Sequence, residues 1–245
     1  MTLSQAYDRW HAHVYASDPE HRDERSPWYD LVLEHIGPVE GKRMLEIACG
    51  RGGFVKFLVS QGAEVIGADF SQVALQIAAA KLTNGKAVAR GVPLTCADAQ
   101  LLPFAANSFD IVISCETIEH LPDPGSALKE MGRVCRTGGL LYLTTPNYFN
   151  AMGLYYVYAR LRGRPATPGS DQPTDHVFFF PEIRGLLKRA GWTIIRSDGT
   201  VHQFPIRPGH NPVAMPSLES NRSVRRILSP LAFHYFLLAK KNKAS

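Results

Sequence analysis

The stretch Glu46-Ile47-Ala48-Cys49-Gly50-Arg51-Gly52-Gly53 decides the fold of this chain. It overlaps an apolar strand predicted at 44–48 and leads into residues 52–61, which have helical spacing and end at Gly62. Residues 64–69 then predict a second strand. Glycines in such a turn lack the side chains that would keep a ligand away from the backbone. The stretch therefore predicts a strand, a ligand-binding turn, a helix and a parallel strand.

The same alternation of strands and helices continues in both directions. Before the turn, Ser26 and Pro27 predict the start of a helix that ends at Gly37. After it, Ser71 predicts the cap of a helix that ends near Asn84 and Gly85. Further strands are predicted at 92–97, 109–114, 140–145, 193–196 and 233–239, and further helices at 124–136 and 181–190. We expect an α/β fold with a Rossmann-like, doubly wound, mostly parallel sheet of seven strands.

One domain is expected to hold the whole chain, because a sheet with helices on both faces can absorb 245 residues. Its expected parts are an N-terminal helical cap (1–40), a cofactor-binding core (42–147), an inserted lid (148–178) and the C-terminal part of the sheet (179–245). The lid is rich in aromatic and basic residues, namely Tyr155, Tyr156, Tyr158, Arg160, Arg162 and Arg164. Two interpretations of this segment stay open, a lid over the site and an ordinary part of the core.

Composition and residue spacing argue against a secreted protein, a membrane-spanning protein and a zinc or disulfide-rich protein. The net charge of +5 and the pI of about 9.1 are too modest to demonstrate nucleic-acid binding. We find no secretory pattern in Met1–Trp10 and no apolar stretch long enough to cross a bilayer, so we expect a cytoplasmic protein. The wide spacing of the cysteines argues against a zinc site or a disulfide framework; they are Cys49, Cys96, Cys115 and Cys135.

Asp69 ends the second predicted strand, about twenty residues after the turn. A carboxylate at this place can accept hydrogen bonds from both hydroxyls of a ribose, which indicates an adenosine-containing cofactor. A nicotinamide dinucleotide is the rival, because Ala48, Gly50 and Gly53 come close to its fingerprint. Glu46 favours a cationic ligand, since its carboxylate would repel a pyrophosphate. The charge balance therefore favours S-adenosylmethionine (SAM).

From Lys42 to Asn147 the chain resembles the class I SAM-dependent methyltransferases. The resemblance implies that Glu46 and the turn hold the methionine part of SAM, and that Asp69 holds the ribose. It also implies that Asp98 and the backbone amide of Ala99 contact adenine. Ala48 stands where the family usually has glycine, which is expected to tighten the turn. The full set of expected cofactor-binding residues is Glu46, Ala48, Gly50, Gly52, Asp69, Phe70, Asp98, Ala99 and Cys115.

The segment Glu116-Thr117-Ile118-Glu119-His120 follows the fourth predicted strand, at the sheet edge where α/β proteins bind ligands. On a helical turn, Glu116 and Glu119 would share one face, with His120 beside them. His120 could then act as a general base. The segment also resembles ubiquinone-pathway O-methyltransferases and small-RNA ribose methyltransferases, which implies Mg²⁺ bound by Glu116, Glu119, His120 and His176. A purely structural histidine is the third interpretation.

The sequence thus predicts a methyltransferase that converts SAM to S-adenosylhomocysteine while it methylates a small-molecule or lipid-like acceptor. Oxygen is the expected acceptor atom, because the segment 116–120 offers groups that can take up a proton, and a carboxylate, nitrogen or carbon nucleophile stays open. An NAD-dependent oxidoreductase, an RNA methyltransferase and a cofactor-binding protein without catalysis stay open as alternatives. Nucleic acid is not the expected partner, and peripheral contact with a membrane is compatible with the sequence.

Overall fold

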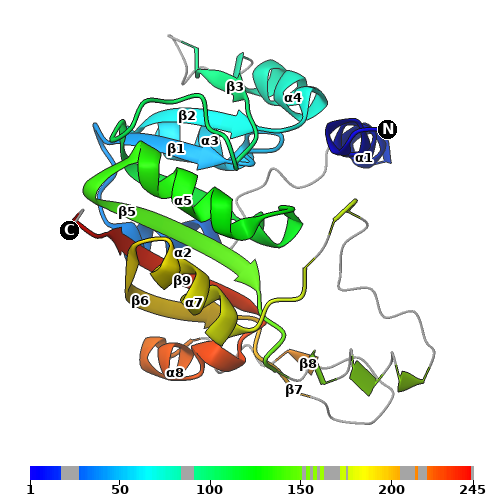
Figure 1. Cartoon of the computed structure of the whole chain (residues 1–245), viewed down its shortest axis with the longest axis vertical. Coiled ribbons are helices and arrows are strands. Elements are labelled where there is room, and N and C mark those ends of the chain that lie inside the picture. Colours follow the sequence, from blue (N-terminus) through cyan, green and yellow to red (C-terminus); the bar gives the residue numbers. More distant parts are fainter. Residues whose placement is uncertain are drawn as a thin grey trace.

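The computed structural model describes residues 1–17, 28–83, 91–150, 153–154, 157–158, 161–162, 172–174, 176–204, 213–214 and 220–243. Its centre is a seven-stranded sheet with the order β3-β2-β1-β4-β5-β9-β6 (Figure 1). The strands are β1 (Arg43–Ile47), β2 (Glu64–Asp69), β3 (Leu94–Cys96), β4 (Phe109–Cys115), β5 (Cys135–Pro146), β6 (Trp192–Thr200) and β9 (His234–Lys241). Only β9 runs against its neighbours β5 and β6, so the expected doubly wound, mostly parallel sheet is confirmed.

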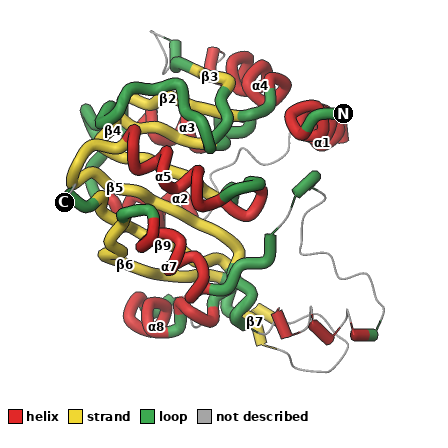
Figure 2. The backbone as a smooth tube through the Cα atoms, in the orientation of Figure 1, coloured by secondary structure: helices red, strands yellow, loops and turns green. Residues whose placement is uncertain are grey.

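Helices cover both faces of the sheet (Figure 2). On one face lie α2 (Trp28–Ile36), α3 (Gly53–Ser60) and α4 (Gln72–Thr83), and on the other lie α5 (Pro124–Val134) and α7 (Phe180–Arg189). Alternate strand residues feed the two cores: Leu141 and Leu143 pack with α5 and α7, whereas Tyr142 packs with the opposite layer. Burial on both faces explains why the strands are almost continuously apolar.

The helical cap contains α1 (Leu3–Ser17), which the sequence analysis had not located as a separate helix. It docks on the start of α4, where Asp8 Oδ1 accepts hydrogen bonds from Ser71 Oγ (2.6 Å) and Val73 N (3.2 Å). Ser71 Oγ in turn accepts from Ala74 N at 3.1 Å, which confirms Ser71 as the cap of this helix. Four more residues that were predicted at helix ends lie outside the described residues; they are Ser26, Pro27, Asn84 and Gly85.

Several element boundaries differ from the prediction, among them the ends of β6, which spans 192–200 rather than 193–196. The sequence predicts a helix over 124–136 and a strand from 140, but α5 ends at Val134 and β5 already begins at Cys135 and includes Gly138 and Gly139. The pairing of β5 with β4 shifts register between Phe109 and Ile111, and a Cβ on Gly139 would lie 2.7 Å from Cys135 Sγ. The glycines thus accommodate an irregular strand rather than end a helix. The third strand is also shorter, at 94–96.

Short elements complete the described chain. They are η1 (Ile118–His120), α8 (Arg222–Ile227), η3 (Ser229–Leu231) and a two-stranded pair formed by β7 (Gln203–Phe204) and β8 (Val213–Ala214). Asn147, which follows β5, links η3 to α7, because its Oδ1 accepts hydrogen bonds from Phe149 N and Phe180 N while its Nδ2 donates to Pro230 O. No helix within the described ranges has the length and apolarity to cross a membrane.

A buried ionic network holds α8 and α2 against β6. Asp198 on β6 is fully buried and accepts hydrogen bonds from Arg225 Nε (2.8 Å) and Nη2 (2.9 Å). His35 Nε2 lies 3.1 Å from the same carboxylate. Burial raises the pKa of Asp198, but the hydrogen bonds from His35 and Arg225 outweigh it and leave the pKa below its ordinary value. The carboxylate is therefore charged and bound from both sides.

We expect Asp198→Ala to destabilise the fold by about 3–5 kcal/mol, because the buried Arg225 would lose its compensating charge. Urea unfolding monitored by circular dichroism measures this loss. The control is Arg136→Ala in the exposed Arg136–Asp110 ion pair, which should cost less than about 1 kcal/mol. Because the pKa of Asp198 is lowered by folding, its stabilisation is present above the unfolded pKa and lost as pH falls through the folded pKa. A variant as stable as wild type at pH 7 would contradict this role.

Candidate functional site

A cavity of about 370 Å³ opens at the carboxyl edge of the parallel strands. It lies where β1 has β2 on one side and β4 on the other, which is the switch point at which doubly wound sheets bind ligands. Seven of the residues singled out from the sequence line it, namely Ala48, Asp69, Phe70, Asp98, Ala99, Glu116 and His120. The cavity thus joins the expected cofactor residues to the segment 116–120.

Glu46 and Cys115 do not line the cavity wall, and neither do Gly50 and Gly52. Glu46 is nevertheless buried near the turn, and its Oε2 has no hydrogen-bond partner among the residues that the structure describes. Burial, and then the charge of Asp69, raise the pKa of Glu46 well above its ordinary value. Such an unpaired carboxyl fits a cationic group, and the amino group of SAM is one.

The glycine turn is held in shape by Asp69. Its Oδ2 accepts a hydrogen bond from Gly50 N (2.8 Å) and its Oδ1 accepts one from Ser71 N (2.8 Å). Burial raises the pKa of Asp69, and these two N–H groups oppose that rise. Ala48 has φ of 55°, a left-handed conformation that costs a non-glycine residue about 1–2 kcal/mol. That strain is the physical reason why glycine suits the position, as the family pattern implies.

Gly52 allows two helices to pack closely. Its φ is 76°, and an added Cβ would lie 3.0 Å from Ala78 Cβ on α4. The missing side chain thus allows α3 to begin close against α4, rather than leaving room for a ligand. On the far side of the cavity, Asp98 Oδ1 accepts from Gln100 N at 2.8 Å. This bond fixes the loop that carries Ala99 and Gln100 into the wall.

One wall of the cavity was not predicted from the sequence. Leu3, Tyr7 and His11 of α1 line it, and their i, i+4, i+8 spacing places them on one face of that helix. Burial lowers the pKa of His11, while the charge of Asp69 acts in the opposite direction. The regular spacing of an aliphatic residue, a tyrosine and a histidine was the signal that could have revealed this wall.

Glu116 and Glu119 do not share a helical face, and that expectation is wrong. Glu116 lies before η1 with φ of 49°, a strained conformation for this residue. Its Oε2 lies 3.2 Å from His234 Nδ1, at the start of β9, and both side chains are partly exposed. Because β9 is antiparallel, its first residue reaches the edge where the parallel strands end. The sequence analysis therefore missed His234, although it had located the strand.

The Glu119 side chain points into the protein interior and lies beside the His120 ring. It is buried, and its Oε2 accepts a hydrogen bond from Thr145 Oγ1 at 3.0 Å. Its Oε1 lies 3.6 Å from His120 Nε2. His120 Nδ1 lies 2.6 Å from Thr174 O, and because a carbonyl only accepts, this nitrogen carries the proton. Nε2 is then the nitrogen that can take up a proton beside the Glu119 carboxylate.

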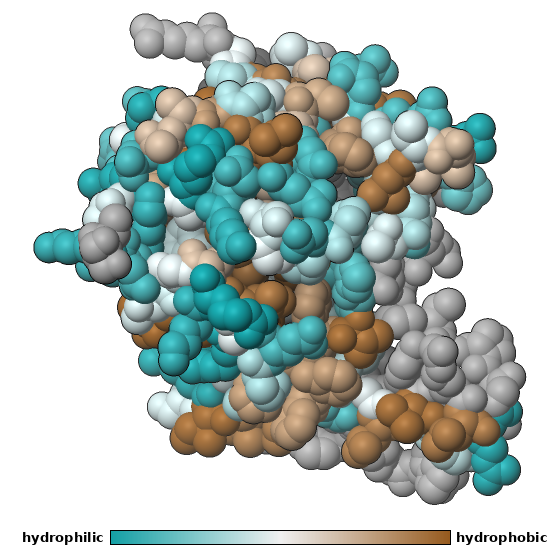
Figure 3. Space-filling model, in the orientation of Figure 1, coloured by the Kyte–Doolittle hydropathy of each residue, from teal (hydrophilic) through white to brown (hydrophobic). Residues whose placement is uncertain are grey.

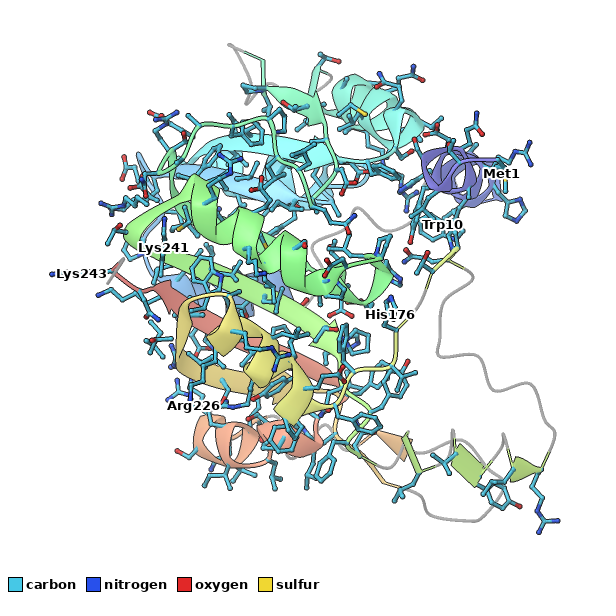
Figure 4. All side chains as sticks on the ribbon, viewed as in Figure 1. Met1, Trp10, His176, Arg226, Lys241 and Lys243 are labelled. Carbon is cyan, nitrogen blue, oxygen red and sulfur yellow. The ribbon has the colours of Figure 1, made fainter. Side chains whose placement is uncertain are left out.

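The four residues expected to bind Mg²⁺ do not converge. His176 is exposed and approaches Glu119 only through its backbone, with His176 N donating to Glu119 O at 2.7 Å. Figure 4 shows His176 on the segment that passes beyond the carboxyl edge of the sheet. No group of three histidine, cysteine, aspartate or glutamate side chains in the described part of the chain is arranged to hold a metal ion. We derive no catalytic step through a metal.

Comparison with known proteins finds similarity to methyltransferases. Residues 45–143 match a family model described as a methyltransferase domain. The chain is 31% identical over 161 residues to a demethylmenaquinone methyltransferase of Renibacterium salmoninarum, covering 64% of this chain and 65% of the relative. It is 32% identical over 166 residues to a ubiquinone biosynthesis O-methyltransferase of Mesorhizobium japonicum, covering 67% and 65%. The chain thus spans less than two thirds of the length of these relatives.

Solved structures share the fold at lower sequence identity. The structure of a [4+2]-cyclase, SpnF, has a TM-score of 0.68 at 21% identity and covers 100% of this chain and 98% of its own. A phosphoethanolamine N-methyltransferase of Haemonchus contortus, solved with S-adenosyl-L-methionine, has a TM-score of 0.69 at 20% identity, covering 99% and 60%. These likenesses confirm the fold alone, because one fold supports several reactions.

We expect S-adenosylhomocysteine to bind more tightly as pH rises, because its cationic amino group favours the charged form of Glu46, whose pKa is raised in the ligand-free protein. Glu46→Gln should lower the affinity about 10- to 100-fold at high pH and flatten this dependence. Calorimetric titration over a pH series measures both effects. Glu64→Gln, on the exposed start of β2, is the matched control. An unchanged affinity in Glu46→Gln would refute the assignment.

The matched domain begins in β1 and ends in β5, so it contains the glycine turn, Asp69 and the segment after β4. Both curated relatives carry the word methyltransferase in their names, and the solved structures share the overall fold. Residues 45–143 of this chain are therefore a methyltransferase domain, similar to those of the class I SAM-dependent family.

Proposed function

We propose that this protein transfers the methyl group of SAM to a hydroxyl oxygen of a small-molecule or lipid-like acceptor. The observation that carries the proposal is the buried carboxyl of Glu46, which has no described partner on Oε2 and stands beside a glycine turn. A second acid, Asp69, lies close enough to raise its pKa further. Two acids at the turn favour a cationic cofactor over a dinucleotide, whose pyrophosphate they would repel.

The proposed class of methyl acceptor depends on the side chains that line the cavity outside the expected cofactor-binding residues. Glu116, Thr117 and His120 line the same cavity as Asp69 and Asp98, so a molecule bound beside them would face the cofactor. Two curated relatives are named for ubiquinone and demethylmenaquinone methylation, which supports a small or lipid-like acceptor here. A hydroxyl is preferred because an imidazole at this wall can accept its proton.

SAM supplies an electrophilic methyl group on a sulfonium centre when it is bound. The chain's own residues then do three things: they hold the donor, exclude water and receive a proton. Asp69, Asp98 and the turn position the donor, while Leu3 and Tyr7 of α1 close the cavity on one side. His120 accepts the hydroxyl proton at Nε2, and Glu119 stabilises the resulting imidazolium. Positioning in a dry cavity supplies much of the rate.

We further propose that residues 148–178 form a lid. Its return segment is tied to the site, because Thr174 O accepts from His120 and His176 N donates to Glu119 O. Gln172, on the same segment, lines the cavity. Tyr155, Tyr156, Arg160 and Arg164, which we expected in the lid, lie outside the described residues. The hydrogen bond between His120 and Thr174 O therefore connects the proposed lid directly to the proposed proton acceptor, His120.

The proposed function is tested with labelled SAM and panels of phenols, sugars, lipid extracts and RNA, each with and without a chelator. We expect label on hydroxyl oxygen of a phenol, sugar or lipid, and no dependence on the chelator. His120→Asn keeps a donor for Thr174 O but cannot accept the proton, so turnover should fall about 100-fold with unchanged S-adenosylhomocysteine affinity. His13→Asn, exposed on α1, is the control. Labelled RNA only, or binding of reduced nicotinamide instead of SAM, would reject the proposal.

Deletion of residues 150–165 tests the lid. We expect this variant to bind S-adenosylhomocysteine as wild type does, because Glu46, Asp69 and Asp98 stay in place. Turnover should be lost, because the acceptor side would be open to water. Calorimetry and the labelling assay on one preparation separate the two effects. Turnover equal to that of wild type would show that the segment is not a lid.

A further inference from the structure

The short helix α8 buries an arginine and exposes an isoleucine, while Val224 and Leu228 are half-buried. Its Arg225 is buried, with 8% of its surface exposed, whereas Ile227, two positions later, is 76% exposed. Surface helices normally place apolar residues inward and arginines outward. Leu231 of η3 is a second exposed apolar side chain, 42% exposed. The exposed Arg222 and Arg226 also lie on α8, where their guanidinium groups pair with Glu34 Oε1 at 3.4 Å and 3.8 Å.

The burial of Arg225 fixes this orientation. Its guanidinium makes two hydrogen bonds to the buried Asp198, at 2.8 Å and 2.9 Å, and lies 3.6 Å from Glu34 Oε2. A helix held by a paired, buried charge cannot rotate without leaving that charge unpaired, which is strongly unfavourable. Ile227 therefore stays in solvent although the apolar side chain would gain by burial.

The insertion shows the same inversion. Leu154, Val157 and Leu161 have the i, i+3, i+7 spacing of one helical face and are 71%, 53% and 82% exposed. Such a stripe would normally pack against a core. Arg162 follows it directly, exposed, with its guanidinium carbon 5.6 Å from the centre of the Tyr158 ring. A cation again stands beside outward apolar side chains.

Both elements lie at the same end of the molecule's long axis. Figure 1 places α8 and the helical turns of the insertion along the lower end, with β7 and β8 between them. The space-filling view shows apolar surface gathered at this end on the left and on the right (Figure 3). Figure 4 places Arg226 there and Lys243 well away from it. We call this end the α8 face; it is defined by Arg222, Arg226, Ile227, Leu231 and the Leu154–Val157–Leu161 stripe.

We propose that the α8 face docks on an anionic lipid surface. Apolar side chains would enter the boundary between headgroups and acyl chains, and the flanking arginines would meet the headgroup charge. A second copy of this chain is the weaker candidate, because a two-fold contact would bring the arginines of each α8 face against those of the other. The docking itself does not depend on the reaction.

Sedimentation with vesicles tests the proposal on the full-length protein. The probes are mixed phosphatidylcholine–phosphatidylglycerol vesicles and pure phosphatidylcholine vesicles. We expect binding to the mixed vesicles that weakens with salt, and much weaker binding to the neutral ones. The double variant Arg222→Gln/Arg226→Gln should lower the partition coefficient about thirty-fold. Ile227→Asp/Leu231→Asp and Leu154→Asp/Leu161→Asp should each lower it at least about ten-fold.

Matched controls remove the same chemistry elsewhere. Lys240→Gln/Lys243→Gln deletes two exposed cations at the C-terminal end of β9, outside the α8 face, and Leu101→Asp changes a leucine that is 78% exposed. Both should bind as wild type does. Unchanged calorimetric binding of S-adenosylhomocysteine confirms that each variant is folded. Absence of vesicle binding, equal binding to neutral vesicles, or self-association that the apolar variants abolish without vesicle binding would each overturn the proposal. None of these outcomes depends on whether a methylated product is found.

Discussion

The burial of two acids beside one glycine turn is the constraint on which the site depends. Asp69 shapes the turn by accepting the N–H of Gly50, and it also raises the pKa of Glu46. Without a ligand this arrangement is electrostatically unfavourable, because two carboxyl groups are desolvated and Glu46 Oε2 has no described partner. A cationic cofactor relieves that cost, so the same burial that weakens the ligand-free site strengthens binding.

Features that depend on residues close together in the chain were predicted correctly from the sequence. Apolar strands, the glycine turn and the acid after β2 depend on residues close in the chain, and all were found in place. Glu116, His234 and α1 depend on tertiary structure instead. Glu116 turned toward His234 because β9 runs antiparallel and brings its first residue to the active edge. No spacing between residues 116 and 234 could indicate that contact, whereas the face of α1 was legible as a helical repeat.

The division between cofactor and acceptor residues follows from the same topology. The turn after β1 and the acid after β2 are built on the sheet, whereas α1, η1 and the return segment around Gln172 are added around it. Chains of this fold therefore keep the sheet-borne part and vary the rest. The likeness to a [4+2]-cyclase illustrates the consequence, since a shared sheet does not determine which reaction the added elements support.

The buried Asp198–Arg225 pair gives the α8 face a physical basis that an exposed isoleucine alone would lack. Single apolar residues on a surface are common and need no explanation. Here an internal ion pair holds the helix with its charge inward, at the cost of desolvating both partners. Consistency between levels of structure is the rule in stable proteins, and departures gather where function requires them. The burial of Arg225 while Ile227 faces outward is such a departure. It lies at the end of the molecule where Leu154, Val157 and Leu161 of the insertion are also exposed.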